Sequence, residues 1–249
     1  MLILSRTSRK QQSGFTLVEI AVVLVIVGFL VGSFVGTFAE RIDTTRRDNT
    51  KKELDEIKKI LKAYAYSQAS VPYLPCPDIS VPPDGLEDRT LGVCDAGTAT
   101  GLLPYATLGI GNGDAWGVRY EYWVDSNYSV STGFVLTEPA TGNATINTRV
   151  GDAIRTIANN AAAVIFSHGK NSLGGISIDD INQPVIPALG NGYDDEFENM
   201  NVNVPIPLFI SRSPSEVGSA ALGGAFDDIV VWIGSFELKA AMVETGLLP

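Results

Sequence analysis

The chain begins with a long apolar run and continues in an amphipathic pattern. The 25 residues Phe15–Ala39 contain a single formal charge, Glu19. Beyond them, apolar residues recur every three to four positions, which is helical spacing: Leu54, Ile57, Leu61 and Tyr64. No proline occurs between Phe15 and Val71. The pattern therefore predicts one helix from Phe15 to about Ser67, broken near Pro72.

The apolar run is long enough to cross a bilayer. At 1.5 Å per residue, 25 helical residues span about 37 Å, more than the hydrocarbon layer of about 30 Å. A cleavable secretory signal has a shorter apolar region. The preceding residues Arg6, Arg9 and Lys10 include no acid, which favours a cytoplasmic N-terminus. A single-pass membrane protein is the simplest interpretation.

Shorter patterns follow in the remainder of the chain. Strands are predicted at residues 117–124, 163–167, 208–210 and 229–233, and helices at residues 152–160 and 235–243. Ser235 is the expected N-cap of the last helix. Residues 69–104 are rich in Pro and Gly and are predicted to form a long loop. The predicted fold class is α+β, with the long helix packed on an antiparallel sheet.

Charge is distributed unevenly and excludes some functions. The 249 residues carry a formal net charge of −10. Residues 1–62 hold 11 Lys/Arg and 7 Asp/Glu, whereas residues 63–249 hold 7 and 21. The acidic region, residues 63–249, repels phosphate backbones, and we therefore expect it to bind no nucleic acid directly. Two cysteines and one histidine cannot complete a four-ligand zinc site without carboxylates.

Glu19 is the unusual residue of the apolar run. An acid within such a run costs about 2.5–3.5 kcal/mol on insertion scales. On physical grounds alone, Glu19 either has a structural role, at the membrane interface or in support of the helix N-terminus, or has a dedicated partner.

The residues around Glu19 resemble a known processing site. Gly14-Phe15-Thr16-Leu17-Val18-Glu19, after a basic leader and before an apolar helix, is similar to the prepilin peptidase site of type IV pilins and pseudopilins. The resemblance implies that a membrane aspartic peptidase cuts between Gly14 and Phe15 and N-methylates the new amine of Phe15. It also implies that Glu19 pairs with the N-terminal amine of a neighbouring subunit.

This resemblance divides the chain into four parts. Residues 1–14 are the leader, 15–39 the transmembrane and filament-core half of the helix, 40–68 its amphipathic half, and 69–249 the periplasmic or extracellular head. Cleavage creates a cation inside an apolar bundle, and a buried charge needs a partner, which Glu19 of an adjacent chain supplies. Gly28, Gly32 and Gly36 lie on one helix face. They are either close-packing positions or simply glycines common in membrane helices.

Cys76 and Cys94 lie in the predicted loop. Oxidation is permitted outside the cytoplasm, so we favour a disulfide over two free thiols. The head also resembles pseudopilins in patches, notably Asp114-Ala115-Trp116-Gly117 followed by Tyr120 and Tyr122.

A calcium site is the one metal site considered, because major pseudopilins carry one in their C-terminal region. The candidate ligands are Asp194, Asp195, Glu196 and Glu198. Their order does not fit the family's loop or an EF-hand, so a solvated acidic loop is the preferred interpretation and no cofactor is expected.

No catalytic motif accompanies these features. His168 is the only histidine, and no Gly-x-Ser-x-Gly elbow occurs. The glycines of residues 109–114 lead into a predicted strand instead of a phosphate-binding helix. We therefore expect a structural protein and not an enzyme.

The expected function is that of a minor pilin or pseudopilin of a type IV pilus or type II secretion pseudopilus. Its partners would be the prepilin peptidase, other pilins and the bacterial inner membrane, with the head in the periplasm before assembly. The alternative is a membrane-anchored or pilus-tip adhesin, which predicts a defined ligand for the head and tolerance of changes at Glu19.

Overall fold

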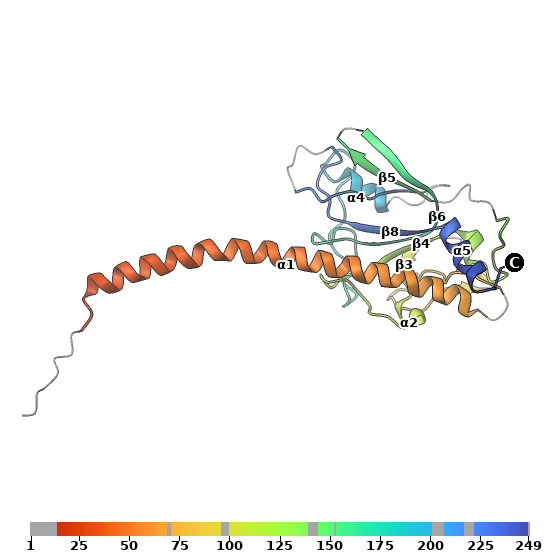
Figure 1. Ribbon diagram of the computed structural model, residues 1–249, viewed down its shortest axis with the longest axis horizontal. Coiled ribbons are helices and arrows are strands. Elements are labelled where there is room, and N and C mark those ends of the chain that lie inside the picture. The colour runs from red at the N-terminus through yellow and green to blue at the C-terminus, as the bar shows by residue number, and fades with distance from the viewer. Residues whose placement is uncertain are drawn as a thin grey trace, which may run out of the picture. The chain divides into compact units, whose positions relative to one another are not determined.

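The computed structural model describes residues 14–68, 71–95, 100–138, 144–151, 153–200, 207–216 and 222–248, with the backbone but not the side chains of residues 33–39. It is an α+β structure with a long N-terminal helix and a curled sheet (Figure 1). Internal contacts divide the chain into two units, Met1–Thr44 and Thr45–Pro249.

The elements follow one another along the chain as labelled in Figure 1. The helices are α1 (Leu17–Ser67), α2 (Tyr105–Leu108), α3 (Ser126–Ser129), α4 (Asp194–Met200) and α5 (Ser235–Glu244). The strands are β1 (Arg89–Thr90), β2 (Val93–Cys94), β3 (Thr100–Leu102), β4 (Glu121–Val124), β5 (Ala144–Val150), β6 (Ala153–Ser167), β7 (Leu208–Ile210) and β8 (Ile229–Gly234).

Helix α1 confirms the prediction of one uninterrupted helix. It covers 51 residues and ends at Ser67, before the proline at position 72. The predicted apolar stripe is the face that packs: Leu54, Ile57, Leu61 and Ala65 are buried in the second unit. In the first unit, every described side chain from Gly14 to Gly32 is exposed.

The main sheet has six strands. Its order is β3-β4-β6-β5-β7, and β8 pairs with β6 outside this path. All pairs are antiparallel except β5 with β7, which is parallel. The prediction of a purely antiparallel sheet is therefore wrong at this pair. The connection from β5 to β7 includes β6 and α4, and so is long enough to bring β7 back parallel.

The sheet buries both of its faces. On one face, the Thr45–Ser67 part of α1 and helix α5 cover a core that includes Tyr122, Ile165 and Ile233. On the other face, Phe166 and Phe209 belong to a second core, against which Met200 of α4 packs. Helices α1 and α4 therefore cover opposite faces of the head sheet.

Two local predictions are wrong. Residues 152–160 were expected to be helical, but the described residues from Ala153 onward form the first half of β6, where they pair with β5. Tertiary pairing overrides a helical pattern that is weak here. Helix α5 does begin at Ser235, but its N-cap is Gly234 without a side-chain hydrogen bond, and the Ser235 hydroxyl is buried and unpaired among the described residues.

The other strand predictions are confirmed, with shifted limits. Strand β7 has the predicted limits and β8 extends one residue further, to Gly234. Of residues 117–124, only the last four form β4, although Val118 and Tyr120 are buried and Val118 makes an isolated bridge to Ser177.

Candidate functional site

Glu19 lies in the first turn of α1 and caps the helix. The backbone N–H and the hydroxyl of Thr16 donate to Glu19 Oε2 at 2.8 and 2.9 Å, and Glu19 N–H donates back to Thr16 Oγ1 at 3.2 Å. This reciprocal pattern is a capping box, which satisfies backbone donors that a helix N-terminus leaves open. Glu19 Oε1 accepts no hydrogen bond from the described residues. One carboxylate oxygen is therefore available to a further donor.

The surface around Glu19 is apolar and exposed. Phe15 is 83% exposed and Leu17 is 90% exposed. A Cβ added at Gly28 or Gly32 would meet no atom within 4 Å, so both glycines face open space. Gly36 belongs to the stretch 33–39, whose surroundings lie outside the described residues. The described side chains of residues 14–32 are all exposed.

The membrane-spanning segment predicted at residues 15–39 includes residues 33–39, whose side chains lie outside the described residues. Among the described residues, no helix contains a segment sufficiently long and apolar to cross a membrane.

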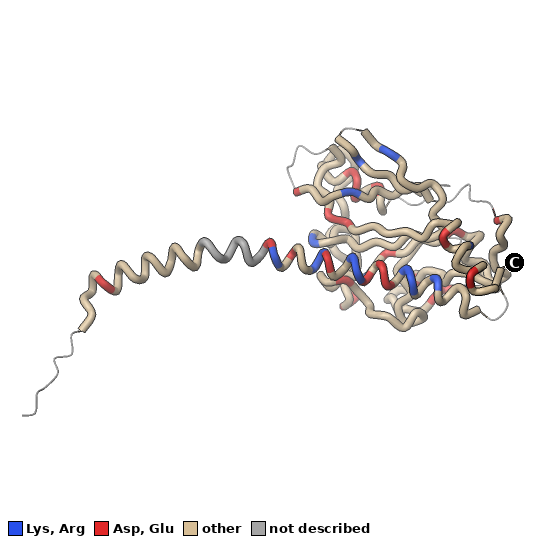
Figure 2. The backbone as a smooth tube through the Cα atoms, viewed as in Figure 1, with Lys and Arg blue, Asp and Glu red and all other residues tan. Residues whose placement is uncertain are grey.

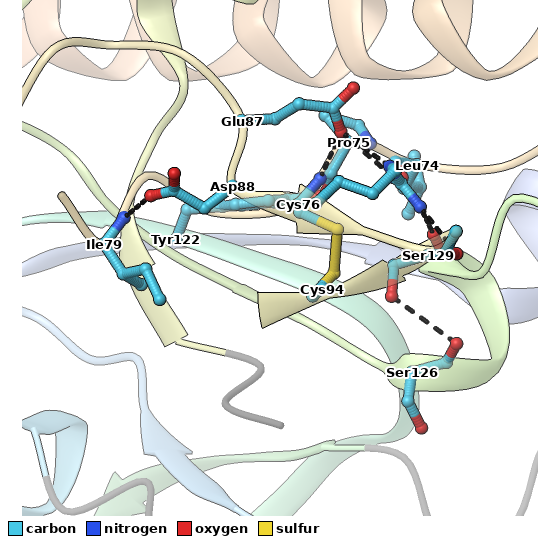
Figure 3. Close-up of a disulfide and its surroundings, with 12 residues drawn as sticks. Leu74, Pro75, Cys76, Ile79, Glu87, Asp88, Cys94, Tyr122, Ser126 and Ser129 are labelled. Carbon is cyan, nitrogen blue, oxygen red and sulfur yellow. Dashed lines mark hydrogen bonds and ion pairs between the residues drawn. A yellow bond between two sulfur atoms is a disulfide. The ribbon is translucent and has the colours of Figure 1, made fainter. Parts of the chain in front are cut away.

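The predicted disulfide is confirmed. Cys76 and Cys94 are joined, with their Cα atoms 5.3 Å apart (Figure 3). Glu87 connects the bridge to α1, because one carboxylate oxygen accepts the Cys76 N–H at 2.9 Å and the other accepts the Tyr64 hydroxyl at 2.8 Å. Burial, reinforced by Glu87, raises the pKa of Tyr64. The predicted long loop is therefore a stapled segment, with the hairpin β1–β2 inside it, held against the helix.

The four candidate calcium ligands do not form one site. They lie in helix α4 and not in the expected solvated loop, and Asp195 and Glu196 are buried. Asp195 accepts from Arg149 at 2.7 Å and from Arg212 at 2.6 Å, which neutralises it. Asp194 accepts the Gly190 N–H at 2.7 Å, and no described contact brings Glu198 to Glu196.

Glu196 instead lies beside two acids, Asp227 and Asp228, that are not among the four candidate ligands. Oxygens of Glu196, Asp227 and Asp228 all lie within 4.8 Å of one another. We call these three residues the acidic cluster. Asp227 and Asp228 precede β8, 31 and 32 positions after Glu196, so no local spacing could have indicated the grouping.

Amide donors surround the acidic cluster. Asn171 Nδ2 donates to both Glu196 oxygens at 2.8 and 3.0 Å, and Asn199 Nδ2 donates to Asp228 at 2.7 Å. Burial and the two neighbouring aspartates raise the pKa of Glu196, and burial likewise raises the pKa of Asp228. The cluster therefore favours bound protons near neutral pH. Its carboxylate oxygens are also the ligands that a hard cation such as Ca²⁺ prefers.

Helix α1 contacts the acidic cluster through one side chain. Arg47 Nη1 donates to the Asp227 carbonyl at 2.8 Å. Gly169 also approaches Asp227 closely: its φ is 60°, and a Cβ there would lie 2.4 Å from the same carbonyl oxygen. A glycine is required at this position because any side chain would displace the segment that carries Asp227.

His168 is a buried residue that directly follows β6, and its carbonyl accepts the Ser172 N–H at 3.3 Å across the turn that comes next. It is 0% exposed, and its Nε2 lies 3.7 Å from Glu121. Burial lowers its pKa, but Glu121 and the nearby Asp228 and Asp114 outweigh burial, and the net shift is upward. The neighbouring Ser167 hydroxyl donates to Asp114 and not to His168, so these residues do not form a nucleophile–base pair.

Comparison with known proteins bears on the N-terminal segment. Residues 9–35 match the prokaryotic N-terminal methylation motif, the signature of type IV pilins and pseudopilins. No curated protein and no solved structure matches the chain.

Proposed function

We propose that this chain, which carries the N-terminal methylation motif at residues 9–35, is a structural subunit of a filament: a minor pilin or pseudopilin of a type IV pilus or type II secretion pseudopilus. The match to this motif is the observation that carries the proposal. The motif supports a pilin-like subunit and includes Gly14, Phe15 and Glu19.

Assembly proceeds through the N-terminal part of α1. Prepilin peptidase cuts between Gly14 and Phe15, and the amine of Phe15 becomes a methylated cation. Glu19 of one subunit accepts this amine from its neighbour. The available oxygen Oε1 supports this step, because Glu19 takes the amine without giving up the Thr16 bonds to Oε2. A charge-assisted bond in an apolar bundle also fixes the register between subunits.

The apolar surface of α1 supplies the remaining interactions. In the membrane this surface faces lipid, and in the filament it faces the same segment of other subunits. Gly28 and Gly32 support close approach, because a Cβ added at either would meet no atom of the described residues within 4 Å. The Cys76–Cys94 disulfide supports a head in the periplasm, since such bonds persist in oxidising compartments. The subunit is structural, and the peptidase supplies the chemistry.

The proposal is tested by Glu19→Ala, with Glu40→Ala as the matched control on the same helix. We expect Glu19→Ala protein to remain in the inner membrane at normal abundance and to disappear from sheared or pelleted filaments. Glu40→Ala should enter filaments as the unaltered chain does. If Glu19→Ala protein enters filaments normally, the proposed pairing is wrong and the adhesin alternative gains support.

A further inference from the structure

Strand β6 has one edge that is paired along only half of its length. Ala161 pairs with Ala144 of β5 and also with Gly234 of β8. Because a strand has two edges, β5 and β8 must lie on opposite sides of β6 at this point. Strand β8 ends at Gly234, where α5 begins. Residues 153–160 of β6 therefore pair with β5 on one side and have no strand among the described residues on the other.

We call the unpaired side of residues 153–160 the free β6 edge. Among the described residues, no hydrogen bond joins its backbone to any other segment, apart from the pairing with β5. Six of these eight residues are exposed, and the other two are half-buried. A row of open N–H and C=O groups in extended conformation is a template for another strand.

The free β6 edge carries few of the features that block natural edge strands, which are charged side chains (especially lysine), proline and β-bulges. Residues 153–160 contain no lysine and no proline and one charge, Arg155, although irregularities interrupt the pairing of residues 156–161 with β5. Ile154 is 51% exposed and Ile157 is 48% exposed, and Val150 of the adjoining β5 is 56% exposed. The β5–β6 hairpin thus combines open backbone groups with exposed apolar side chains.

The charge of the free β6 edge indicates which kind of incoming strand would bind there. Arg155 is the only charged residue of the free β6 edge; it is exposed and makes no ion pair with any described residue. Arg149 on the neighbouring strand is already occupied by Asp195. An incoming strand therefore meets one unneutralised cation between two exposed isoleucines.

We propose that the free β6 edge binds an extended segment of a partner protein, with alternating apolar and acidic residues, by strand addition. Backbone hydrogen bonds supply the affinity. Ile154 and Ile157 contact apolar side chains, and Arg155 pairs with a carboxylate of the incoming strand. This surface lies in the head and uses no residue of the N-terminal segment, so it does not depend on the proposed assembly through Glu19.

The test is selection of 12-residue peptides from a random phage library against the full chain in detergent micelles. We expect enrichment of peptides that alternate apolar residues with Asp or Glu. Arg155→Glu should weaken binding of these peptides about tenfold and select basic peptides instead, because like charges across an interface repel. Ile157→Lys should abolish binding, since lysine blocks edge pairing. Arg46→Glu, an exposed change of equal charge on α1, should leave binding unchanged.

Three results would overturn the proposal. One is the absence of enriched peptides from repeated selections. Another is equal binding of the enriched peptides to the Ile157→Lys chain, provided that the variant melts at the temperature of the unaltered chain. The third is self-association of the full chain that Ile157→Lys abolishes in the absence of peptide, because the occupant is then a second copy and not an acidic partner.

Discussion

The two halves of α1 share one uninterrupted helix but have opposite surroundings. In residues 14–32 every side chain is exposed, and the apolar positions surround the helix on all sides. In residues 50–65 the apolar positions form one stripe, and Leu54, Ile57 and Leu61 are buried against the head. A helix that is apolar all round needs a surrounding partner, whereas a stripe needs only one surface. The head supplies that one surface to the second half.

Charge separates the two halves in the same way. Glu19 is the only charged residue of α1 before residue 33, and residues of both signs follow closely after residue 39. Figure 2 shows the same contrast, with few coloured segments early in α1 and closely spaced red and blue segments in its later part. The charges of the second half lie beside the buried stripe, and Lys62 donates to Glu237 of α5 at 2.8 Å. The second half is thus built to lie between a core and water, whereas the first half exposes an apolar surface with a single charge.

Truncating one leucine in each half of α1 tests whether only the second half stabilises the head. Leu61→Ala removes a fully buried side chain and should lower the free energy of unfolding of the head by about 2–5 kcal/mol. Leu24→Ala, at a position that is 65% exposed, should leave it unchanged. Urea denaturation of the full chain in detergent checks both variants. Equal destabilisation would show that the head does not distinguish the two halves.

Removal of the disulfide tests how much the segment around Cys76 and Cys94 stabilises the second half of α1. Replacing both Cys76 and Cys94 by serine should cost about 3 kcal/mol, because the bridge closes a loop with a sequence separation of 18. The Glu87 contact to Tyr64 should then loosen, and amide hydrogen exchange at the end of α1 should accelerate. Unchanged exchange there would mean that the stapled segment does not support the helix.

The acidic cluster predicts that stability depends on pH. The pKa of Glu196 is raised from 4.5 to about 8 by burial and by Asp228 and Asp227. A carboxyl with a raised pKa favours the folded state only while it is protonated. Its contribution is complete below about pH 4.5 and is lost as the pH rises through about 8. The melting temperature should fall over this range.

Two variants test whether Glu196 causes this pH dependence of the melting temperature. Glu196→Gln keeps the shape without the charge and should flatten the fall in melting temperature, whereas Glu56→Gln on the exposed face of α1 should not. A bound Ca²⁺ ion is the alternative to protonation as a means of reducing the repulsion between the carboxylates of the acidic cluster. A melting shift with millimolar Ca²⁺ that Glu196→Gln abolishes would indicate that a cation, and not protons, occupies the acidic cluster.

The smallest expected effect concerns the surface charges of the second half. Lys62→Ala removes a pair in which the Lys62 side chain is 26% exposed and that of Glu237 is 42% exposed. Such pairs contribute about 0.2–1 kcal/mol, and added salt should reduce the difference further. A loss as large as that of Leu61→Ala would show that charge, and not burial, holds α1 to the head.

The sequence alone predicts the features that depend on local pattern. The length of α1, its buried stripe, strands β7 and β8 and the Cys76–Cys94 pair follow from periodicity, turn residues and the cysteine count. The motif at residues 14–19 is equally local, and its assigned roles stay predictions.

Features that depend on distant pairing were not predictable in this way. Residues 153–160 become a strand because β5 offers a partner, and the parallel β5–β7 pair depends on a long connection. The acidic cluster joins α4 to the segment before β8, and Asp195 was expected among candidate ligands although two arginines occupy it. Spacing along the chain carries no signal for contacts made across a fold.

The central claim is that the N-terminal half of α1 is prepared for assembly by processing at Gly14–Phe15. Intact mass and N-terminal sequencing of membrane-extracted protein, from cells with and without prepilin peptidase, test it directly. We predict a chain that begins at N-methylated Phe15 only when the peptidase is present. A chain that begins at Met1 in both strains would contradict the pilin account and leave a plain helical anchor with an acidic head.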